Sequence, residues 1–412
     1  MKTSRSTEVA SHTTTQVTTD DLKALVYGAC FLASGGGGPI SMALNFLQRM
    51  KHPVALVQRD QLAHDKLAAI AADMGSPDAT LHGHGYSAPV NAFKAFEALL
   101  KEKHPDEALQ YLLPIEIGAV NSLIPFFISE QLGSKISVVD TDPSGRSVPQ
   151  LNETLLDLSD QPIYPAMLAS DTDADGKYHS NPLTESLTPT ELEDKARDIV
   201  SSSDYQQVGG LCCYPMQSNW LLSAETELVK GSLTKAMELG KTLLSSTHSD
   251  DLKKALKALG VDAWLLFEGK LTDIKNTTAH GFDVGKLVFT NTDKEQLWVY
   301  YKNESLIAWD PQQGKPWVLA PDCINIRLLK DHGDKLKGSP LSTADIAMHQ
   351  HCEVWGTACD IKMRDSRMVS RFQQNISQII AAYPDDGLQH HVGYQPIEKL
   401  MEHKSAAEPA SL

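Results

Sequence analysis

The first half of the chain predicts helices and strands that alternate. Apolar residues recur at helical spacing over 21–33 and again over 40–50, where Pro39 suits the first turn. Residues 109–118 are largely apolar and predict a buried strand, residues 119–133 predict a helix, and residues 135–142 predict a second strand. Such a strand–helix–strand unit is typical of a parallel α/β sheet.

The pattern changes after Val261, where short β-branched and aromatic runs alternate with turn residues. A polar segment over about 170–204 separates the two halves. We therefore predict an α/β N-terminal domain with a parallel or mixed sheet and a β-rich α+β C-terminal domain. The expected divisions are a disordered leader (1–20), the N-terminal domain with its Gly-rich loop (21–185), the C-terminal domain (186–402) and a tail (403–412).

Composition limits the classes of protein and partner. The net charge of −15 argues against nucleic acid and anionic membranes, since duplex binding needs a basic face. No run reaches the roughly 18 apolar residues of a membrane span, and the polar N-terminus lacks the apolar core of a secretory signal. The six cysteines form no C-x-x-C pair. We expect a cytoplasmic protein that binds a small molecule, with a homo-oligomer as the general prior.

Four consecutive glycines, Gly35 to Gly38, connect the first two predicted helices. Glycines before a helix let backbone N–H groups approach an anion, which the helix dipole favours. The ligand could be a carboxylate, a phosphate or a developing oxyanion, and Ser34 could add a hydroxyl. The alternative is a tight connection where two backbones touch. The Lys-Ser/Thr of a P-loop does not follow.

A group of acidic residues falls at the ends of two predicted strands. Glu116 follows the first strand, and Asp140 and Asp142 end the second. Ligands of open α/β sheets bind beyond the carboxyl ends of strands, and paired carboxylates can divide acid and base roles or share a metal. Arg146 could bind a carboxylate, and Asn121 could donate an amide hydrogen bond. Asp at a strand end also commonly makes turns and caps.

Two further candidates lie in the C-terminal half. His280 sits in an expected β-hairpin and is a candidate acid, base or ligand. Asn303 and Glu304 interrupt an aromatic and aliphatic strand, either at a bulge or at a site wall. A divalent metal such as zinc would take Asp140, Asp142 and His280, although the chain has no strong zinc spacing.

Several motifs, in this order, resemble the S-methyl thiohydantoin desulfurase-like family, also labelled hydantoinase-like. They are "GACFLASGGGGP", "PIEIGAVNSLIP", "VVDTDPSGRSVPQL" and "KNESLIAW", and the resemblance runs from about residue 20 to 400. It implies a two-domain fold that removes sulfur from a thiohydantoin-type ring and leaves a hydantoin-type ring. Related members resemble enzymes of ergothioneine breakdown, which release hydrogen sulfide from a thioxo-imidazolidinone propionate.

The family motifs match this chain unevenly. The glycine run and the Asn303–Glu304 pair match, as do five positions of the acidic element: Asp140, Asp142, Gly145, Arg146 and Pro149. Pro39 stands where the family usually has Asp, Gln150 where it has Glu, and Ala279–His280 alter the T-T-G-G-F segment. These departures concern the substrate more than the class of reaction.

The residues and the resemblance together predict a hydrolase that releases sulfide or thiol from a thiohydantoin-like ring. Water activated by Asp140, by Asp142 or by a bound metal would attack the ring carbon between two nitrogens. Arg146 or the glycine amides would hold a substrate carboxylate or the developing anion. Two alternatives stay open: a ring-opening hydantoinase-type amide hydrolase, and a catalytically silent small-molecule-binding protein of the same fold. A nucleotide-dependent enzyme is a weaker third.

Overall fold

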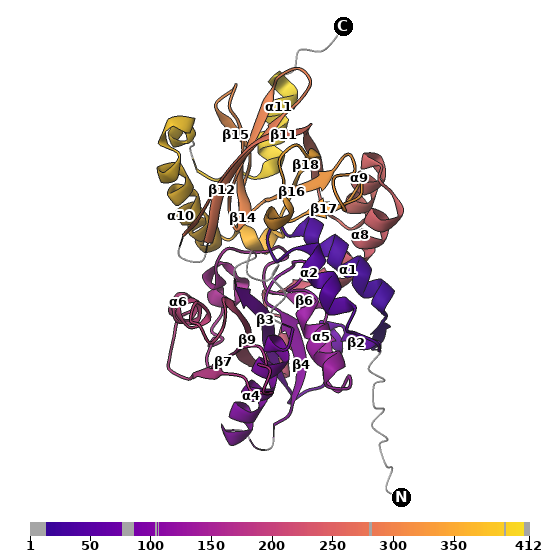
Figure 1. Ribbon diagram of the computed structural model, residues 1–412, viewed down its shortest axis with the longest axis vertical. Coiled ribbons are helices and arrows are strands. Elements are labelled where there is room, and N and C mark those ends of the chain that lie inside the picture. Colours follow the sequence, from indigo (N-terminus) through magenta and orange to yellow (C-terminus); the bar gives the residue numbers. More distant parts are fainter. Residues whose placement is uncertain are drawn as a thin grey trace, which may run out of the picture.

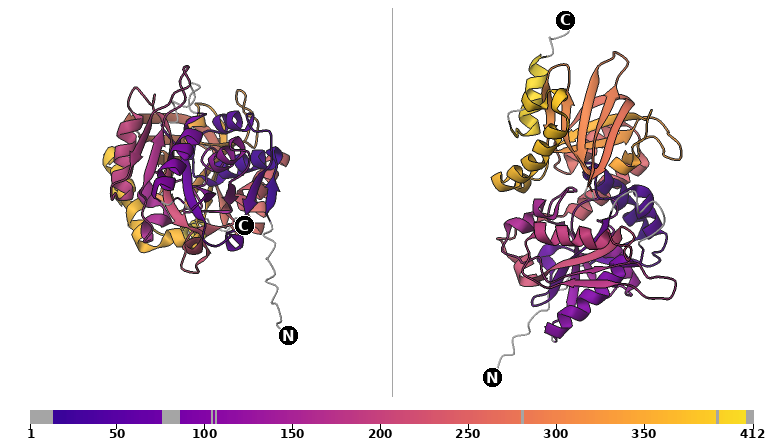
Figure 2. Two further views of the ribbon diagram at one scale, coloured as in Figure 1. Left: turned by 90° about the horizontal axis from the view of Figure 1, so that it is seen from below. Right: turned by 60° about the vertical axis from the view of Figure 1, so that its left-hand side comes forward.

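Two eight-stranded sheets divide the molecule into an N-terminal and a C-terminal lobe (Figure 1). The structure is a computed structural model and describes residues 14–75, 86–103, 105, 107–279, 282–390 and 393–407. Figure 2 shows the lobes stacked along the long axis of the molecule.

The N-terminal sheet is mixed, which is one of the two forms, parallel or mixed, that the sequence predicts. Its central strands β2, β5, β4 and β3 run parallel, while both ends of the sheet add antiparallel strands. In spatial order its strands are β1 (Thr15–Val17), β2 (Val54–Val57), β5 (Ser137–Val139), β4 (Leu109–Pro114), β3 (Leu67–Gly75), β9 (Val208–Gln217), β7 (Ala166–Ala169) and β8 (Ser180–Leu183).

Among the helices of the described residues are α1 and α2, the two that the glycine run was predicted to connect. In chain order they are α1 (Thr19–Leu32), α2 (Ile40–Leu47), α4 (Ala88–Lys103), α5 (Ile124–Gln131), α6 (Pro189–Val200), α7 (Ser218–Leu222), α8 (Ser232–Ser245), α9 (Ser249–Ala258), α10 (Ser366–Ala382) and α11 (Ile397–Ala407). Helix α5 begins five residues later than the pattern predicts, because residues 115–123 form turns beyond the end of β4.

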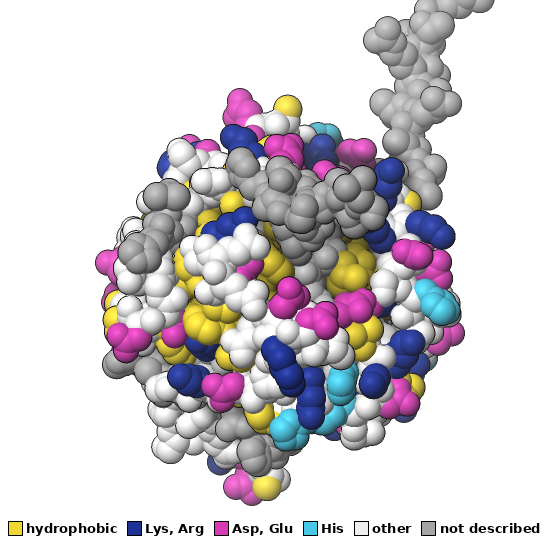
Figure 3. Space-filling model, turned by 90° about the horizontal axis from the view of Figure 1, so that it is seen from above, with side chains coloured by type: hydrophobic (Ala, Val, Ile, Leu, Met, Phe, Trp, Pro, Cys, Tyr) yellow, Lys and Arg dark blue, Asp and Glu magenta, His cyan; other side chains and the backbone are white. Residues whose placement is uncertain are grey.

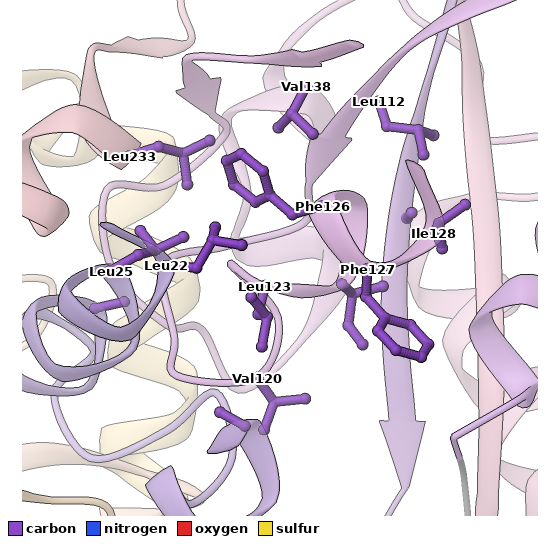
Figure 4. Packing of buried hydrophobic residues seen from close by; sticks show 14 of the residues in the cluster. Leu22, Leu25, Leu112, Val120, Leu123, Phe126, Phe127, Ile128, Val138 and Leu233 are labelled. Carbon is purple, nitrogen blue, oxygen red and sulfur yellow. The ribbon is translucent and has the colours of Figure 1, made fainter. Parts of the chain in front are cut away.

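Local signals explain where α1 begins. The Thr18 hydroxyl accepts a hydrogen bond from the Asp21 backbone N–H, and the Asp21 carboxylate accepts one from the Thr18 N–H, which forms a capping box. The buried face of α1 then packs against α8 and α5. Figure 4 shows Leu22 and Leu25 of α1 beside Leu233 and Phe126, in one continuous core.

The C-terminal sheet is antiparallel throughout, so the predicted β-rich domain is confirmed. Its strands, in spatial order, are β15 (Lys315–Leu319), β14 (Glu304–Asp310), β13 (Gln296–Lys302), β12 (Phe282–Thr290), β11 (Ala263–Ala279), β18 (His351–Thr357), β16 (Cys323–Leu328) and β17 (Pro340–Leu341). Helix α10 packs against β13 and β14, and α11 packs against β15. A separate two-stranded ribbon pairs β6 (Thr141–Asp142) with β10 (Val229–Lys230).

The structure changes three of the expected divisions. Residues 15–17 of the predicted leader form strand β1, which pairs with β2. Strand β9 follows the expected boundary at 185/186 in sequence but lies between β3 and β7 of the N-terminal sheet. Helix α11 extends to Ala407, past the expected start of the tail. Tertiary pairing decides the first two, because β1 and β9 gain their backbone partners from residues far away in sequence.

Hydrogen bonds join the two lobes near the glycine loop. The Ser34 hydroxyl donates to the carbonyl of Ser305 over 2.9 Å and accepts from the N–H of Ile324 over 3.0 Å. Arg146 is fully buried and donates from Nη1 to the carbonyls of Pro321 and Asp322, at 2.6 and 3.2 Å. Both residues therefore fix the lobes against each other.

No helix among the described residues combines the length and apolar character that crossing a bilayer requires. On the face drawn in Figure 3, acidic and basic side chains are interspersed.

Candidate active site at the junction of the lobes

A pocket of about 150 Å³ lies where the two lobes meet. A single water molecule needs roughly 10–15 Å³ on this measure, so the pocket has room for a small organic ring. Both lobes supply its walls. They consist of the glycine loop, Met42, residues 72–75, residues 115–116 and 120–121, residues 148–151, Glu193 and Arg197 of α6, Leu211, Asn303 and Glu304, and residues 342–344.

The glycine loop passes very close to the opposite wall. A Cβ atom on Gly36 would lie 1.9 Å from the Glu304 Oε1 atom, and one on Gly37 would lie 2.3 Å from the Gly118 Cα atom. Gly37 also has a φ of 69°, which favours glycine. The Gly37 carbonyl accepts a hydrogen bond from the Val120 N–H at 2.9 Å. The loop therefore has no side chains because the Gly118 backbone and the Glu304 carboxylate approach it closely. The loop also lines the pocket.

Glu116 and Asn121 lie together on the turns after β4. The Asn121 Nδ2 atom donates to Glu116 Oε1 over 2.6 Å, and the Val148 N–H donates to Glu116 Oε2 over 2.9 Å. Burial raises the pKa of Glu116, and these hydrogen bonds oppose that rise. Asn121 also accepts a hydrogen bond from the Asp73 N–H at 3.0 Å. The amide therefore holds Glu116 in one orientation.

Glu304 belongs to the other lobe and lines the same pocket as Glu116. Its Oε1 atom accepts from the Ser147 hydroxyl at 2.8 Å, while its buried Oε2 atom has no hydrogen-bond partner in the described part of the chain. Burial raises the pKa of Glu304 well above its usual range, and the nearby Glu116 charge raises it further. Two buried carboxyls this strongly linked hold one proton between them more readily than they hold two negative charges.

Asn303 shapes the turn that presents Glu304. It adopts a φ of 58° between β13 and β14, and its side-chain oxygen accepts from the Asp283 N–H at 2.8 Å. The Thr343 hydroxyl donates to the Asn303 carbonyl at 2.8 Å and to the Gly35 carbonyl at 3.1 Å. Asn303 thus lines the pocket as a turn residue whose side chain is already engaged.

Four predicted site residues lie outside the pocket lining. Asp140 caps the N-terminus of α8: its side chain accepts from the N–H groups of Leu233 and Thr234, from the Thr234 hydroxyl and from Gln58. Asp142 accepts from the N–H groups of Ser144 and Gly145 in a turn. Ser34 and Arg146, described above, join the lobes. These four side chains have structural partners and do not meet the pocket.

Of the expected metal site, the structure describes Asp140 and Asp142 but not the third ligand. Within them, no group of three or more His, Cys, Asp or Glu side chains is placed to hold an ion. Both oxygens of Asp140 already accept hydrogen bonds, from donors that a metal ion would have to displace. His280 lies outside the described residues.

Sequence reasoning missed several residues of the pocket. Asp73, Glu193 and Arg197 line it, and the Arg197 guanidinium donates from Nε and Nη2 to Glu193 Oε1 at 3.0 and 2.5 Å. Gln150, which occupies the position of a family Glu, lines it too. Asp73 had a usable signal, since it is a charged residue inside the apolar strand "LAAIAADMG". Glu193 and Arg197 belong to a polar helix pattern that gave none.

Comparisons with known proteins agree with this architecture. Residues 20–177 match the family model described as "S-Me-THD-like, N-terminal domain", and residues 188–373 match "S-Me-THD-like, C-terminal domain". A crystal structure of a protein from Chromobacterium violaceum is similar, with a TM-score of 0.77 and 24% sequence identity. The similarity covers 93% of this chain and 100% of that one, and it concerns the fold alone. No curated protein matches the chain. Because the two matches span most of its residues, the chain belongs to the S-Me-THD-like family.

Proposed function

We propose that this protein is a hydrolase that releases sulfide or thiol from a thiohydantoin-type five-membered ring. The observation that carries the proposal is the pair formed by Glu116 and Glu304. The two buried carboxyls come from different lobes and line one small pocket, and the charge of Glu116 raises the pKa of Glu304. Membership of the S-Me-THD-like family supports the substrate class.

The pair suits hydrolysis because its members differ in environment. Glu116 accepts two hydrogen bonds, which favour its ionised form, whereas Glu304 accepts one and its Oε2 atom has no partner among the described residues. We assign Glu116 as the general base and Glu304 as the general acid, a division that follows from the two environments. The roles first predicted for Asp140 and Asp142 therefore pass to these two glutamates.

The reaction then balances with water as the one co-substrate. Glu116 takes a proton from water as the water oxygen bonds to the ring carbon between the two nitrogens. The displaced electron pair moves to sulfur in a thioxo ring, or to the C=N nitrogen in an S-methyl ring, and Glu116 returns the proton to that atom. The tetrahedral intermediate collapses as Glu116 takes its hydroxyl proton, the C=O bond forms, the C–S bond breaks and Glu304 protonates the departing sulfur. The proton on Glu116 then passes back to Glu304. A thioxo ring gives hydrogen sulfide, an S-methyl ring gives methanethiol, and both leave a hydantoin-type carbonyl. The steps described here use water and the two glutamates and do not require a metal ion.

The glycine loop and Asn121 provide the setting for this step. Gly36 lets the Glu304 carboxyl lie against the loop backbone, and Asn121 fixes the orientation of Glu116. Orientation of this kind accounts for a large part of enzymatic rate enhancement.

The test is release of sulfide or thiol from a small panel of 2-thiohydantoins and S-methyl thiohydantoins, with and without chelator. We expect release that is indifferent to chelator. Release that stops with chelator would contradict the carboxyl-pair mechanism. If the folded protein releases nothing, assays for opening of hydantoin rings and for binding without turnover distinguish the two alternatives.

A further inference from the structure

Asp73 is the pocket carboxyl that the mechanism above does not use. It lies near the carboxyl end of β3, where ligands of parallel sheets bind. Strands β3 and β4 pair with Ala71 opposite Pro114, so Asp73 and Glu116 each follow the paired position by two residues. The sheet thus carries both acidic residues to the same edge of the pocket.

Asn121 links Asp73 to the catalytic pair. The Asn121 Oδ1 atom accepts from the Asp73 backbone N–H at 3.0 Å, and its Nδ2 atom donates to Glu116 at 2.6 Å. One amide side chain therefore fixes the distance between Asp73 and the proposed base. A ligand that contacts Glu116 has Asp73 within its immediate surroundings.

One oxygen of the Asp73 carboxyl lacks a hydrogen-bond partner among the described residues. Its Oδ1 atom is buried and makes no hydrogen bond in the described part of the chain. Burial raises the pKa of Asp73 well above its usual range, and the charge of Asp171 adds to that rise. The protonated carboxyl offers one O–H donor and one acceptor oxygen. A buried polar group without a partner is costly, so a ligand that pairs with it gains affinity.

The donor and acceptor of a carboxyl match the N–H and C=O of a ring amide, which lie side by side on one edge. In the proposed reaction the carbon between the two nitrogens faces Glu116 and Glu304. The ring edge that remains is the N3–H beside the C4 carbonyl. We infer that Asp73 is a specificity-determining residue that binds this edge through two hydrogen bonds. The inference rests on the proposed function for the orientation of the ring.

The test is isothermal titration calorimetry with hydantoin, 1-methylhydantoin and 3-methylhydantoin. For the unmodified protein we expect 3-methylhydantoin to bind at least tenfold more weakly than hydantoin, because its methyl group replaces the N3–H. Asp73→Leu removes donor and acceptor at similar size and should abolish this preference. Asp73→Asn keeps a donor and an acceptor and should retain it. The ratio for 1-methylhydantoin should stay the same in all three proteins.

Melting temperatures accompany each titration, and Asp73→Ala replaces the leucine variant if the latter does not fold. The inference is overturned if Asp73→Leu keeps the preference, if Asp73→Asn loses it, or if the unmodified protein binds none of the rings. Failure of the proposed function is a different result. It is the absence of sulfide or thiol release by the unmodified protein, whatever the ring titrations give.

Discussion

Acidic side chains lie both in the pocket and at the N-terminus of α8, and the two places differ in the hydrogen-bond donors that they supply to them. At α8, Asp140 accepts two backbone N–H groups and two side-chain donors. In the pocket, Glu304 accepts one hydrogen bond and leaves its second oxygen without a described partner. A carboxylate with its donors supplied stabilises a fold, whereas a buried carboxyl that lacks them is available to a ligand. The comparison separates Asp140 from Glu304. The pocket lining moves the predicted chemistry to Glu116 and Glu304, since Asp142 also has a buried Oδ1 atom without a described partner but lies outside the lining.

The largest expected effect comes from Glu304→Gln. The variant keeps the size of the side chain but cannot donate a proton to sulfur, so turnover should fall by about 10²–10⁴. Its melting temperature should stay the same or rise, because the substitution removes a buried carboxyl next to Glu116. Sulfide release and thermal denaturation measure the two effects. Full activity in the variant would remove Glu304 from the mechanism and with it the contrast with α8.

Asp142 makes stability depend on pH. Burial raises its pKa from 3.8 to about 6. The folded chain therefore holds this proton more tightly than the unfolded chain does. Its contribution to stability is greatest below pH 4 and is lost as pH rises through 6, by about 3 kcal/mol in total.

Denaturant titrations between pH 4 and 7 compare the unmodified protein with Asp142→Asn. The amide oxygen can still accept from the N–H groups of Ser144 and Gly145 but does not titrate. We expect the variant to lose less stability across this range. Equal slopes would show that the Asp142 carboxyl is not the group responsible.

Asp140→Ala should give the smallest effect and the opposite pattern to Glu304→Gln. Loss of a helix cap costs about 1–2 kcal/mol, while sulfide release per folded molecule should stay unchanged. This reverses the expectation from the sequence, which gave Asp140 a catalytic role. Loss of turnover in a variant that remains folded would restore that role and contradict the assignment of Asp140 as a cap.

The candidate site was predicted in part. The glycine run and the segments around Glu116, Asn121 and Asn303–Glu304 stood out in the sequence, and the structure brings them together in one pocket. Arg146 stood out equally, yet it is buried between the lobes with backbone carbonyls as partners. Residue type and spacing did not separate these cases, since tertiary partners decide them: the Arg146 partners Pro321 and Asp322 are 175 and 176 residues away.

The sequence by itself determined the class of each lobe and the start of α1, because hydrophobic periodicity and capping are local. It also determined that four consecutive glycines, Gly35 to Gly38, come shortly after that helix. Only the tertiary structure decided which carboxyl lines the pocket and which is a helix cap. Hydrogen-bond donors, burial and neighbouring charge set the state of a carboxyl, and here they come from the opposite lobe: Glu304 meets Gly36, Ser147 and Glu116 because two separate sheets dock at the glycine loop.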